Sequence, residues 1–580
     1  MSDDSPTPAE SASQRALEAM FRCLEENQSF RLEAGAGAGK TYSLIKALRH
    51  LIESKKDIFP KLGQQIACIT FTNVAKSEIE ARTDQNPLVY CGTNHAFCWT
   101  LISGFQKQLR VLVEALPSWV EKLAEAGGSL GSRSVDYSLG YRSLKEDRAN
   151  LHHDDVLPLT ISLMQHDKFR RMIAERFPII LVDEYQDTHN DWIEAIKALF
   201  LGKEGSPLFG FFGDHWQKIY GEGCGRLDHP AVLEIGKQAN FRSVATVIDC
   251  LNRMRPELQQ FAEKPDSVGE VRVFHTNHWT GDRQKGGHWG GDLPVEAAHQ
   301  TYEKTKELLE QNGWNFSYRY TKILILTHRL LASEQGYSGL ASAFRFKEAY
   351  TKKDHPYIAF FVDELEPASD WFSERKFGRM FDALGGAIPL VRRHSDKVAW
   401  NNSMERLERL RETGTIGEVI DHLQETRKPR LPDAIQKIER DLRDFTGNEG
   451  EDLPNALDEI RKLRSVPYLE VKALRRYLDG HSPFETKHGV KGAEFENVLI
   501  VFGRGWNNYN FGEMLELANR SHVPPARAEA FERNRNLFYV ACSRPKTRLA
   551  LLFTQKLTPE AISTLQRWFS AAAIFEAPLP

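Results

Sequence analysis

The sequence lacks the features that mark a membrane protein, a secreted protein or a metal-cluster protein. It contains no run of about 18 apolar residues, so no membrane-spanning helix is predicted. None of its seven cysteines forms a C-x-x-C pair, which argues against a zinc or iron–sulfur site and favours a reduced, cytoplasmic setting. The first residues, MSDDSPTPAESAS, are acidic and polar, unlike a signal or transit peptide.

The chain also lacks an internal repeat and an excess of charge. A net charge of −3 over 580 residues gives no global attraction to nucleic acid, although a basic groove can lie on a neutral protein. The length predicts roughly three or four domain-sized units of about 150 residues each.

Three short apolar segments that end in polar residues predict one nucleotide-binding sheet. They are QQIACITFTN (64–73), FPIILVDEYQDT (177–188) and PLFGFFGDHWQ (207–217), each rich in residues typical of buried strands. Ligands of open parallel sheets bind beyond the carboxyl ends of the strands. A glycine-rich loop followed by the helical pattern SLIKALRHLIE adds a fourth unit of the same kind.

A second α/β unit is predicted from four later apolar segments, at residues 269–276, 321–329, 495–503 and 547–555. A charged, helical region of roughly 340–480 separates the second of these segments from the third. A smaller insertion, at about 100–165, divides the first sheet.

The segment EAGAGAGKTYS, residues 33–43, has the pattern of a phosphate-binding loop. A Walker A motif reads G-x-x-x-x-G-K-[ST], and Ala34 stands here at the first glycine position. A methyl group is tolerated there where φ stays negative. In such a loop Lys40 reaches the β- and γ-phosphate oxygens and Thr41 binds Mg²⁺. The alternative is a glycine-rich turn that carries Gly-Lys-Thr by chance.

The segment LVDEYQDT places two carboxylates at the end of an apolar strand. Asp183 suits the Mg²⁺ site, and Glu184 suits the base that orients the attacking water. An adjacent Asp–Glu pair is also typical of a solvated turn or a helix start. The apolar strand before it favours the catalytic interpretation.

Eight segments in order resemble the motifs of superfamily 1 helicases of the UvrD/Rep (PcrA) type. They are AGAGAGKT, ITFTNVAKSEIEAR, GTNHAFC, VDEYQDT, FFGDHWQKIY, NFRS, TKHGVKGAEFENV and NLFYVACSR. The resemblance runs from about Gln14 to Arg544, and relatives also commonly have alanine at the first Walker position. It implies an α/β fold of two RecA-like P-loop domains with parallel sheets, each interrupted by a mainly helical insertion.

The implied domain boundaries are as follows: 1–100 and 166–266 for the first, ATP-binding RecA-like domain, 101–165 for a small helical insertion resembling subdomain 1B, 267–340 and 481–580 for the second RecA-like domain, and 341–480 for a reduced helical insertion resembling subdomain 2B.

The resemblance also assigns roles in ATP hydrolysis. Gln14 is similar to the glutamine that reads the adenine edge, Gln217 to the γ-phosphate sensor and Glu494 to the residue that binds the ribose. Arg242 and Arg544 match two arginine fingers, whose planar cations suit the charge of the transferring phosphoryl group. The implied catalytic set is Lys40, Glu184, Gln217, Arg242 and Arg544. The implied nucleotide-binding set is Gln14, Ala34, Gly35, Ala36, Gly37, Ala38, Gly39, Lys40, Thr41, Tyr42, Phe241, Arg242, Glu494 and Arg544, with Thr41 and Asp183 for Mg²⁺.

A further set resembles the family's contacts to single-stranded DNA: Phe71, Thr72, Asn73, Thr93, His95, Thr486 and His488. Aromatic rings stack on bases, and hydroxyl or amide groups hold phosphates. Two alternatives stay open, namely that Phe71 is a core residue at a strand end and that His95 only begins a helix. The segment NLHHDDVL, residues 150–157, suggests a metal cluster, but a capped helix with histidines in its first turn is favoured.

Three departures from the family pattern bear on function. Tyr220 is followed by GEGCGRLDHP, without the tryptophan that stacks on a base in relatives, so Trp216 or Tyr220 is expected to substitute. Tyr42 stands where many relatives have an arginine over the adenine, with Phe241 placed to stack on the other face. The insertion before residue 480 is small, and no nuclease domain is expected after Arg544.

The favoured function is that of an ATP- and Mg²⁺-dependent motor on single-stranded or tailed DNA, with 3′→5′ polarity and duplex unwinding implied by the resemblance alone. A second hypothesis is a nucleotide-controlled interaction subunit, gated by a protein partner such as a nuclease in a phage-defence assembly of the Gabija type. A third, a P-loop small-molecule kinase or simple NTPase, is disfavoured by the paired arginines from two domains.

Overall fold

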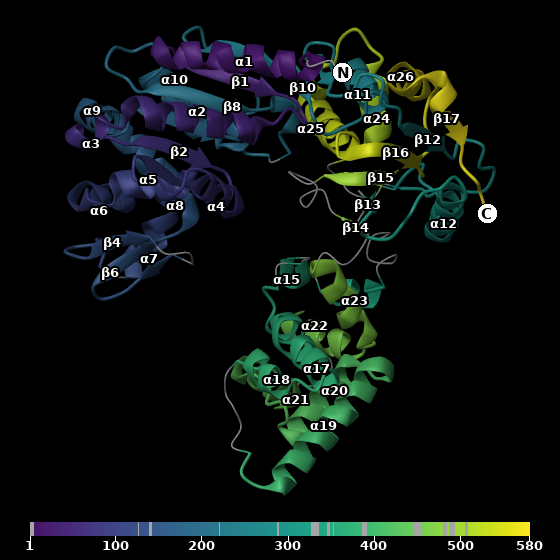
Figure 1. Cartoon of the computed structure of the whole chain (residues 1–580). Helices are drawn as coiled ribbons and strands as arrows, with labels where there is room; N and C mark the ends of the chain where they lie inside the picture. The colour runs from purple at the N-terminus through teal and green to yellow at the C-terminus, as the bar shows by residue number, and fades with distance from the viewer. Residues whose placement is uncertain are drawn as a thin grey trace.

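The computed structural model describes residues 5–125, 127–137, 142–219, 221–286, 289–325, 336–344, 348–351, 353–385, 391–444, 455–479, 484–485, 494–504 and 509–580. These residues form two α/β units, each built on a six-stranded parallel sheet, together with a small insertion and a separate helical subdomain (Figure 1). Within this part of the chain, no helix is long and apolar enough to cross a membrane.

The first sheet has the strand order β3-β2-β7-β8-β1-β9, and every neighbouring pair is parallel. Its strands are β1 Phe30–Ala34, β2 Ile66–Thr70, β3 Val89–Thr93, β7 Ile179–Asp183, β8 Leu208–Gly213 and β9 Leu233–Lys237. Strands β2, β7 and β8 are almost wholly apolar and buried along their whole length, as expected of a sheet covered on both faces. Strand β1 is equally buried but carries Arg31 and Glu33. Parallel pairing brings their carboxyl ends to one edge, where the predicted motifs begin.

Helices cover both faces of this sheet. They are α1 Pro8–Glu25, α2 Lys40–Lys55, α3 Phe59–Leu62, α4 Asn73–Arg82, α5 Asn94–Ile102, α9 Asp167–Arg176 and α10 Asn190–Leu199, with short 3₁₀ turns η2 Tyr185–Asp187 and η3 His215–Gln217 and a small pair of strands, β10 Ala239–Asn240 and β11 Phe261–Ala262. The next helix, α11 Ala245–Met254, packs instead against the core of the second sheet.

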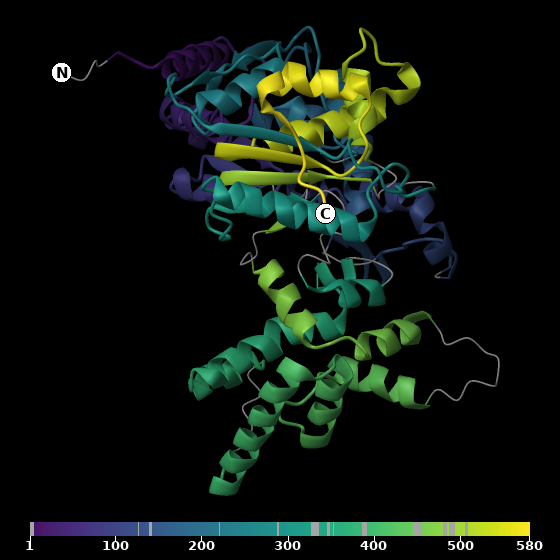
Figure 2. The ribbon, with the colours of Figure 1, turned by 90° about the vertical axis from the view of Figure 1, so that its right-hand side faces the viewer.

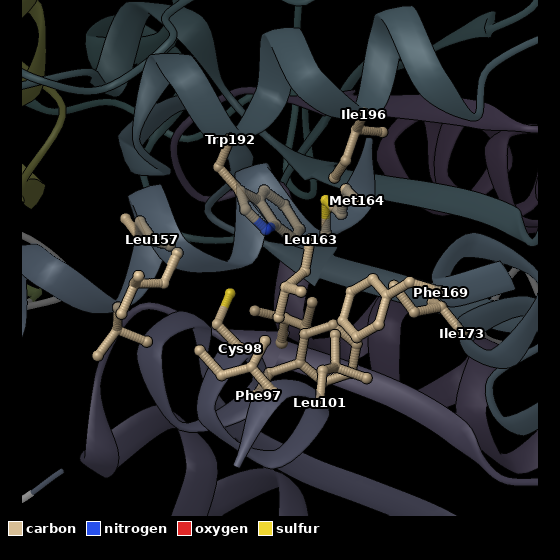
Figure 3. Packing of buried hydrophobic residues seen from close by; sticks show 14 of the residues in the cluster. Phe97, Cys98, Leu101, Leu157, Leu163, Met164, Phe169, Ile173, Trp192 and Ile196 are labelled. Atoms are coloured by element: carbon tan, nitrogen blue, oxygen red, sulfur yellow. The ribbon is translucent and has the colours of Figure 1, made fainter. Parts of the chain in front are cut away.

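A continuous apolar core joins the small insertion to the first sheet. Figure 3 shows labelled side chains from α5, α9, α10 and α8 of the insertion packing together: Phe97, Cys98, Leu101, Leu157, Leu163, Met164, Phe169, Ile173, Trp192 and Ile196. The insertion is therefore anchored by burial and has little freedom to move against the sheet.

The insertion is mainly helical but also contains a small sheet that the sequence did not predict. Its elements are α6 Gln106–Glu114, η1 Pro117–Trp119, α7 Val120–Glu125, β4 Ser134–Tyr137, β5 Ser143–Leu144, β6 Arg148–Leu151 and α8 His153–Met164. The strand order is β4-β6-β5. Strands of four residues or fewer carry too short an apolar pattern to be read from sequence.

The capped helix predicted at residues 150–157 is confirmed. His152 lies at the N-cap of α8, where its Nδ1 accepts the N–H of Asp154 at 3.3 Å, and the Asp155 carboxylate accepts the N–H of His152 at 3.0 Å. The histidines of this segment thus begin a helix.

The second sheet has the order β14-β13-β15-β16-β12-β17, again with parallel pairs throughout. Its strands are β12 Glu270–His275, β13 Thr321–Ile325, β14 Phe484–Glu485, β15 Phe495–Phe502, β16 Pro545–Phe553 and β17 Ile574–Glu576. The helices around it are α12 Val295–Gln311, α24 Phe511–Ala518, α25 Pro525–Cys542 and α26 Pro559–Phe569, with η5 Ala571–Ala573.

The helical subdomain lies apart from both sheets and has its own core (Figures 1 and 2). Its elements are α14 Ser338–Ala343, α15 Glu348–Thr351, α16 Pro356–Ala359, η4 Phe360–Leu365, α17 Glu366–Ser373, α18 Phe377–Ala383, α19 His394–Thr413, α20 Ile416–Thr426, α21 Asp433–Asp444, α22 Asn455–Arg464 and α23 Leu469–Leu478. Glu366 receives two 2.7 Å bonds from Arg411 and one of 3.0 Å from the Tyr468 hydroxyl, which fixes α17 against α19 and α23.

We expect Asp155→Ala to destabilise the insertion by about 2–4 kcal/mol in urea denaturation. Asp155 is 2% exposed and accepts bonds from Arg142 at 2.8 Å and from the Trp119 indole at 3.1 Å, so the alanine leaves buried donors without an acceptor. The matched control is Asp154→Ala, an exposed neighbour, whose effect should stay within about 0.5 kcal/mol. Equal effects of the two variants would contradict this account.

Candidate functional site

The phosphate-binding loop has the backbone geometry that its glycines allow. Gly37 and Gly39 adopt φ of +75° and +72°, and a Cβ built on Gly37 would lie 2.5 Å from Asn240 Oδ1. Ala34 ends β1 and is not among the residues with positive φ, which explains why alanine is tolerated there. Gly39 precedes α2 without a side-chain cap, so the first N–H groups of α2 are open to an anion.

Lys40 lies against the two predicted acidic residues. Its Nζ is 2.7 Å from Glu184 Oε2. Burial alone would lower the pKa of Lys40, but the Glu184 and Asp183 carboxylates outweigh it and raise the pKa. Lys40 is thus fully charged at neutral pH and is held beside the carboxylate predicted to act as base.

Glu184 itself has a strained backbone, with φ of +49° in the left-handed region. Such a conformation costs about 1–3 kcal/mol in a non-glycine residue and clusters at functional sites. It occurs where β7 turns into η2, and Gln186 Nε2 donates to the Glu184 carboxylate. The strain directs Glu184 back toward Lys40.

The residues at the predicted Mg²⁺ position fit a hard divalent cation. Asp183 is the last residue of β7 and is 5% exposed, and Thr41 lies in the first turn of α2. A carboxylate and a hydroxyl oxygen beside a phosphate site are the ligands that Mg²⁺ prefers.

The two domains meet at Gln217 and Arg544. Arg544 Nη2 lies 3.4 Å from Gln217 Oε1, and its Nε donates to Val540 O at 2.8 Å. Arg544 is 1% exposed; burial, with Arg242 adding to it, lowers the pKa of Arg544 to about 9. A desolvated cation held by the second domain lies against the residue predicted to sense the γ-phosphate.

Arg242 also connects the two domains. Its Nε donates to Glu494 at 3.1 Å and its Nη1 to Ser543 O at 3.1 Å. Burial would raise the pKa of Glu494, but the Arg242 charge outweighs it and lowers the pKa. The predicted finger and the predicted ribose contact are therefore paired with each other in this arrangement.

The predicted base-stacking residues flank the loop. Tyr42 and Phe241 are 49% and 38% exposed, and both lie near the position of a Cβ built on Gly39, at 3.7 Å and 4.0 Å. Gln14 is exposed on α1 and donates to Glu18 at 2.9 Å. The exposed rings suit a nucleobase.

A buried charge network supports the motif around Asp214. Arg255 is 1% exposed; it donates to Asp214 at 2.6 Å and to Glu33 at 3.2 Å. The Tyr185 hydroxyl donates to the Glu33 carboxylate at 2.7 Å, and the His215 ring also contacts this carboxylate. Glu33, Asp214 and His215 have the spacing of metal ligands, but Arg255 pairs with both carboxylates and Arg31 pairs with Glu33, so the group is a salt-bridge network.

Trp216 does not occupy the position expected of a DNA contact. It is 7% exposed and packs edge-to-face on Tyr539 of α25, with ring centroids 5.3 Å apart. The Arg535 guanidinium lies 4.0 Å from the Trp216 ring centroid. The expectation that Trp216 stacks on a base is therefore corrected, because the ring is covered within the interface between the two domains.

The other predicted DNA contacts lie beyond β2 and β3. Phe71 is 39% exposed, which disfavours a core role, and Asn73 is the first residue of α4. Thr72 and Thr93 cap α4 and α5 with bonds of 3.1 Å and 3.4 Å. His95 is half-buried and stacks on His153, with ring centroids 3.4 Å apart. Tyr220, Thr486 and His488 lie outside the described residues.

Sequence reasoning missed several residues that shape the site: Lys237, Arg255 and Arg535. None lies in a motif quoted above, whereas Asn536 and His153 lie in quoted segments but were given no role in the site. The one available signal was a charged residue at the end of a strand or helix, as at Lys237 and Arg255, because charged residues are seldom fully buried unless they are paired.

Two parallel sheets, a phosphate loop on the first and an arginine from the second at the same site define a two-domain P-loop nucleoside triphosphatase. Comparison with known families matches residues 17–222 to an AAA domain and residues 344–556 to a UvrD-like helicase C-terminal domain.

Two of the curated relatives that are similar to the chain illustrate the range of the match. It is 23% identical to the Gabija protein GajB of Bacillus cereus (strain HuB5-5), over 94% of this chain and 96% of that protein. It is 23% identical to the ATP-dependent DNA helicase PcrA of Staphylococcus aureus (strain Mu50), over 38% of this chain and 37% of that protein. Together, the two family matches and these relatives support a UvrD-like, ATP-hydrolysing DNA helicase of superfamily 1.

We expect Arg544→Ala to lower kcat for ATP hydrolysis by at least about 100-fold while the KM for ATP changes less than about fivefold. A guanidinium at this position acts on the charge of the transition state more than on ground-state binding. The control is Arg520→Ala, an exposed arginine of the same domain. Equal losses in the two variants, or a loss confined to KM, would contradict the finger role.

Proposed function

We propose that the chain is an ATP-driven translocase on single-stranded DNA that moves 3′→5′ and separates duplex strands. The observation that carries this proposal is the ATP site shared between two sheets, where Gln217 of the first domain lies 3.4 Å from Arg544 of the second. Binding and loss of the γ-phosphate at such a junction change the relative position of the two domains.

The chain's own groups account for the hydrolysis. Lys40 binds the β- and γ-phosphates, and Glu184 accepts a proton from the attacking water, which it orients. When bound at Thr41 and Asp183, Mg²⁺ supplies charge neutralisation of the phosphate oxygens. Arg242 and Arg544 stabilise the charge that spreads over the transferring phosphoryl group. Lys40 now pairs with Glu184 at 2.7 Å, so ATP must separate them before Glu184 can act as base.

DNA would bind along the carboxyl ends of β2 and β3. Phe71 offers an exposed ring, and α4 and α5 begin there with the N-terminal N–H groups that favour phosphates. The buried Trp216 leaves fewer aromatic contacts on this track than the sequence suggested. The 3′→5′ polarity rests on the resemblance to the family alone.

The second candidate is a subunit whose ATPase is gated by a protein partner, such as a nuclease in a defence complex. Two observations favour it: the similarity to the Gabija protein GajB over 94% of the chain, and the loss of Trp216 from the predicted DNA track. In this reading the protein is a cytoplasmic component of antiviral defence.

Steady-state ATP hydrolysis with and without single-stranded oligonucleotide separates the two candidates. We expect at least about tenfold stimulation by DNA and its complete loss in Glu184→Gln, followed by unwinding of 3′-tailed but not 5′-tailed duplexes. A basal rate that ignores DNA and rises only with a partner protein would overturn the autonomous motor and favour the gated subunit.

A further inference from the structure

Lys237, at the end of the edge strand β9, is a buried cation that no predicted motif contains. It pairs in register with Ala34 and is 0% exposed. Its Nζ donates to Ser43 Oγ at 2.7 Å and to Gly39 O at 3.2 Å. The side chain therefore ends beneath the first turn of α2, immediately after the phosphate loop.

Nothing anionic among the described residues neutralises this charge. No carboxylate lies within ion-pair distance of Lys237 in that part of the chain, and burial lowers its pKa to about 8, so the ammonium is still mainly charged at pH 7. Its surroundings are positive instead. The N-terminal end of α2 carries the positive end of the helix dipole. The Tyr42 ring, 5.6 Å from Nζ, offers the ammonium a weak cation–π attraction but no negative charge, and Lys46 lies 5.4 Å from the same ring.

A charge in this position destabilises the nucleotide-free chain. Removing an ammonium from water without an opposite charge is costly, and two hydrogen bonds to neutral groups offset only part of the cost. A polyphosphate bound at the N-terminus of α2 would bring several negative charges close to Lys237. The unfavourable electrostatic free energy of the Lys237 ammonium without nucleotide would then be replaced by attraction between the ammonium and the phosphates.

We propose that Lys237 is a positioning residue for the nucleotide, a buried cation that lowers the stability of the empty site and strengthens the binding of a nucleoside polyphosphate. The proposal deepens the function proposed above and rests on the same nucleotide site. The ligand class is a nucleoside di- or triphosphate, since an uncharged nucleoside lacks the compensating charge. Lys237 acts through electrostatics and through the first turn of α2, and takes no part in the chemical step.

The test is Lys237→Met, which keeps the length and apolar character of the side chain and removes its charge. We expect two changes of opposite sign. The melting temperature of the nucleotide-free protein should rise by about 1–3 °C, because an uncompensated buried charge is gone. The Kd for fluorescent mant-ADP with Mg²⁺ should rise about 5–20-fold, while kcat for ATP hydrolysis stays within about twofold.

Two further variants make the test specific. Lys237→Gln retains a hydrogen-bond donor to Ser43 without the charge and should weaken mant-ADP binding as the methionine does. Lys46→Met removes the other, more exposed cation at the Tyr42 ring, and its effect on Kd should stay below about twofold because solvent screens that charge.

Each remaining outcome overturns the proposal in a distinguishable way. A lower melting temperature in Lys237→Met together with weaker mant-ADP binding would show an ordinary structural role. Unchanged binding in Lys237→Met, with normal binding by the wild-type chain, would overturn the role of Lys237 alone. Failure of the wild-type chain to bind mant-ADP would overturn the nucleotide site itself.

Discussion

The nucleotide site depends on the buried carboxylate of Asp214 at the end of β8. It accepts a 2.6 Å bond from Arg255, a 2.7 Å bond from the Gln217 amide and a 3.0 Å bond from the N–H of Trp216. One carboxylate thus sets the fold of η3, the orientation of Gln217, the proposed γ-phosphate sensor, and the position of the end of α11. A fully buried carboxylate is tolerated only with such donors, so we expect the loss of one of the three contacts to weaken the other two.

The same turn carries the contact between the domains. Asn536 of α25 donates to the carbonyl oxygens of His215 and Lys218 at 3.1 Å and 3.2 Å, and Arg535 covers Trp216 at 4.0 Å. A change at the γ-phosphate that moves Gln217 must therefore strain bonds made by the second domain. This is the short physical path by which hydrolysis can become relative motion of two sheets, and it explains why an aromatic ring is buried here instead of facing DNA.

Much of the site could be predicted because its residues adjoin apolar strands. Asp183 ends the apolar strand β7, Glu184 follows it, and Lys40 lies just beyond the loop after β1, so parallel pairing of the strands brings the three residues to one edge of the sheet. Arg255 and Lys237 could not be predicted, since their partners Glu33 and Ser43 lie far away in the sequence and no local pattern links them. The environment of Trp216 could not be predicted from the sequence either. A tryptophan suggests stacking on a base, but only the three-dimensional packing shows that Tyr539 and Arg535 already cover its ring.

Two energetically unfavourable features lie close to the phosphate loop. Glu184 holds φ at +49°, and Lys237 holds a buried charge beside the N-terminus of α2. Other buried ions of the described chain are paired with an opposite charge, for example Arg411 with Glu366 and Arg255 with Asp214. Because unfavourable features persist in a fold only where the surrounding packing enforces them, their concentration at one site favours a site built to bind an anion. In the function proposed above, a bound nucleotide would separate Lys40 from Glu184 and bring opposite charge to Lys237.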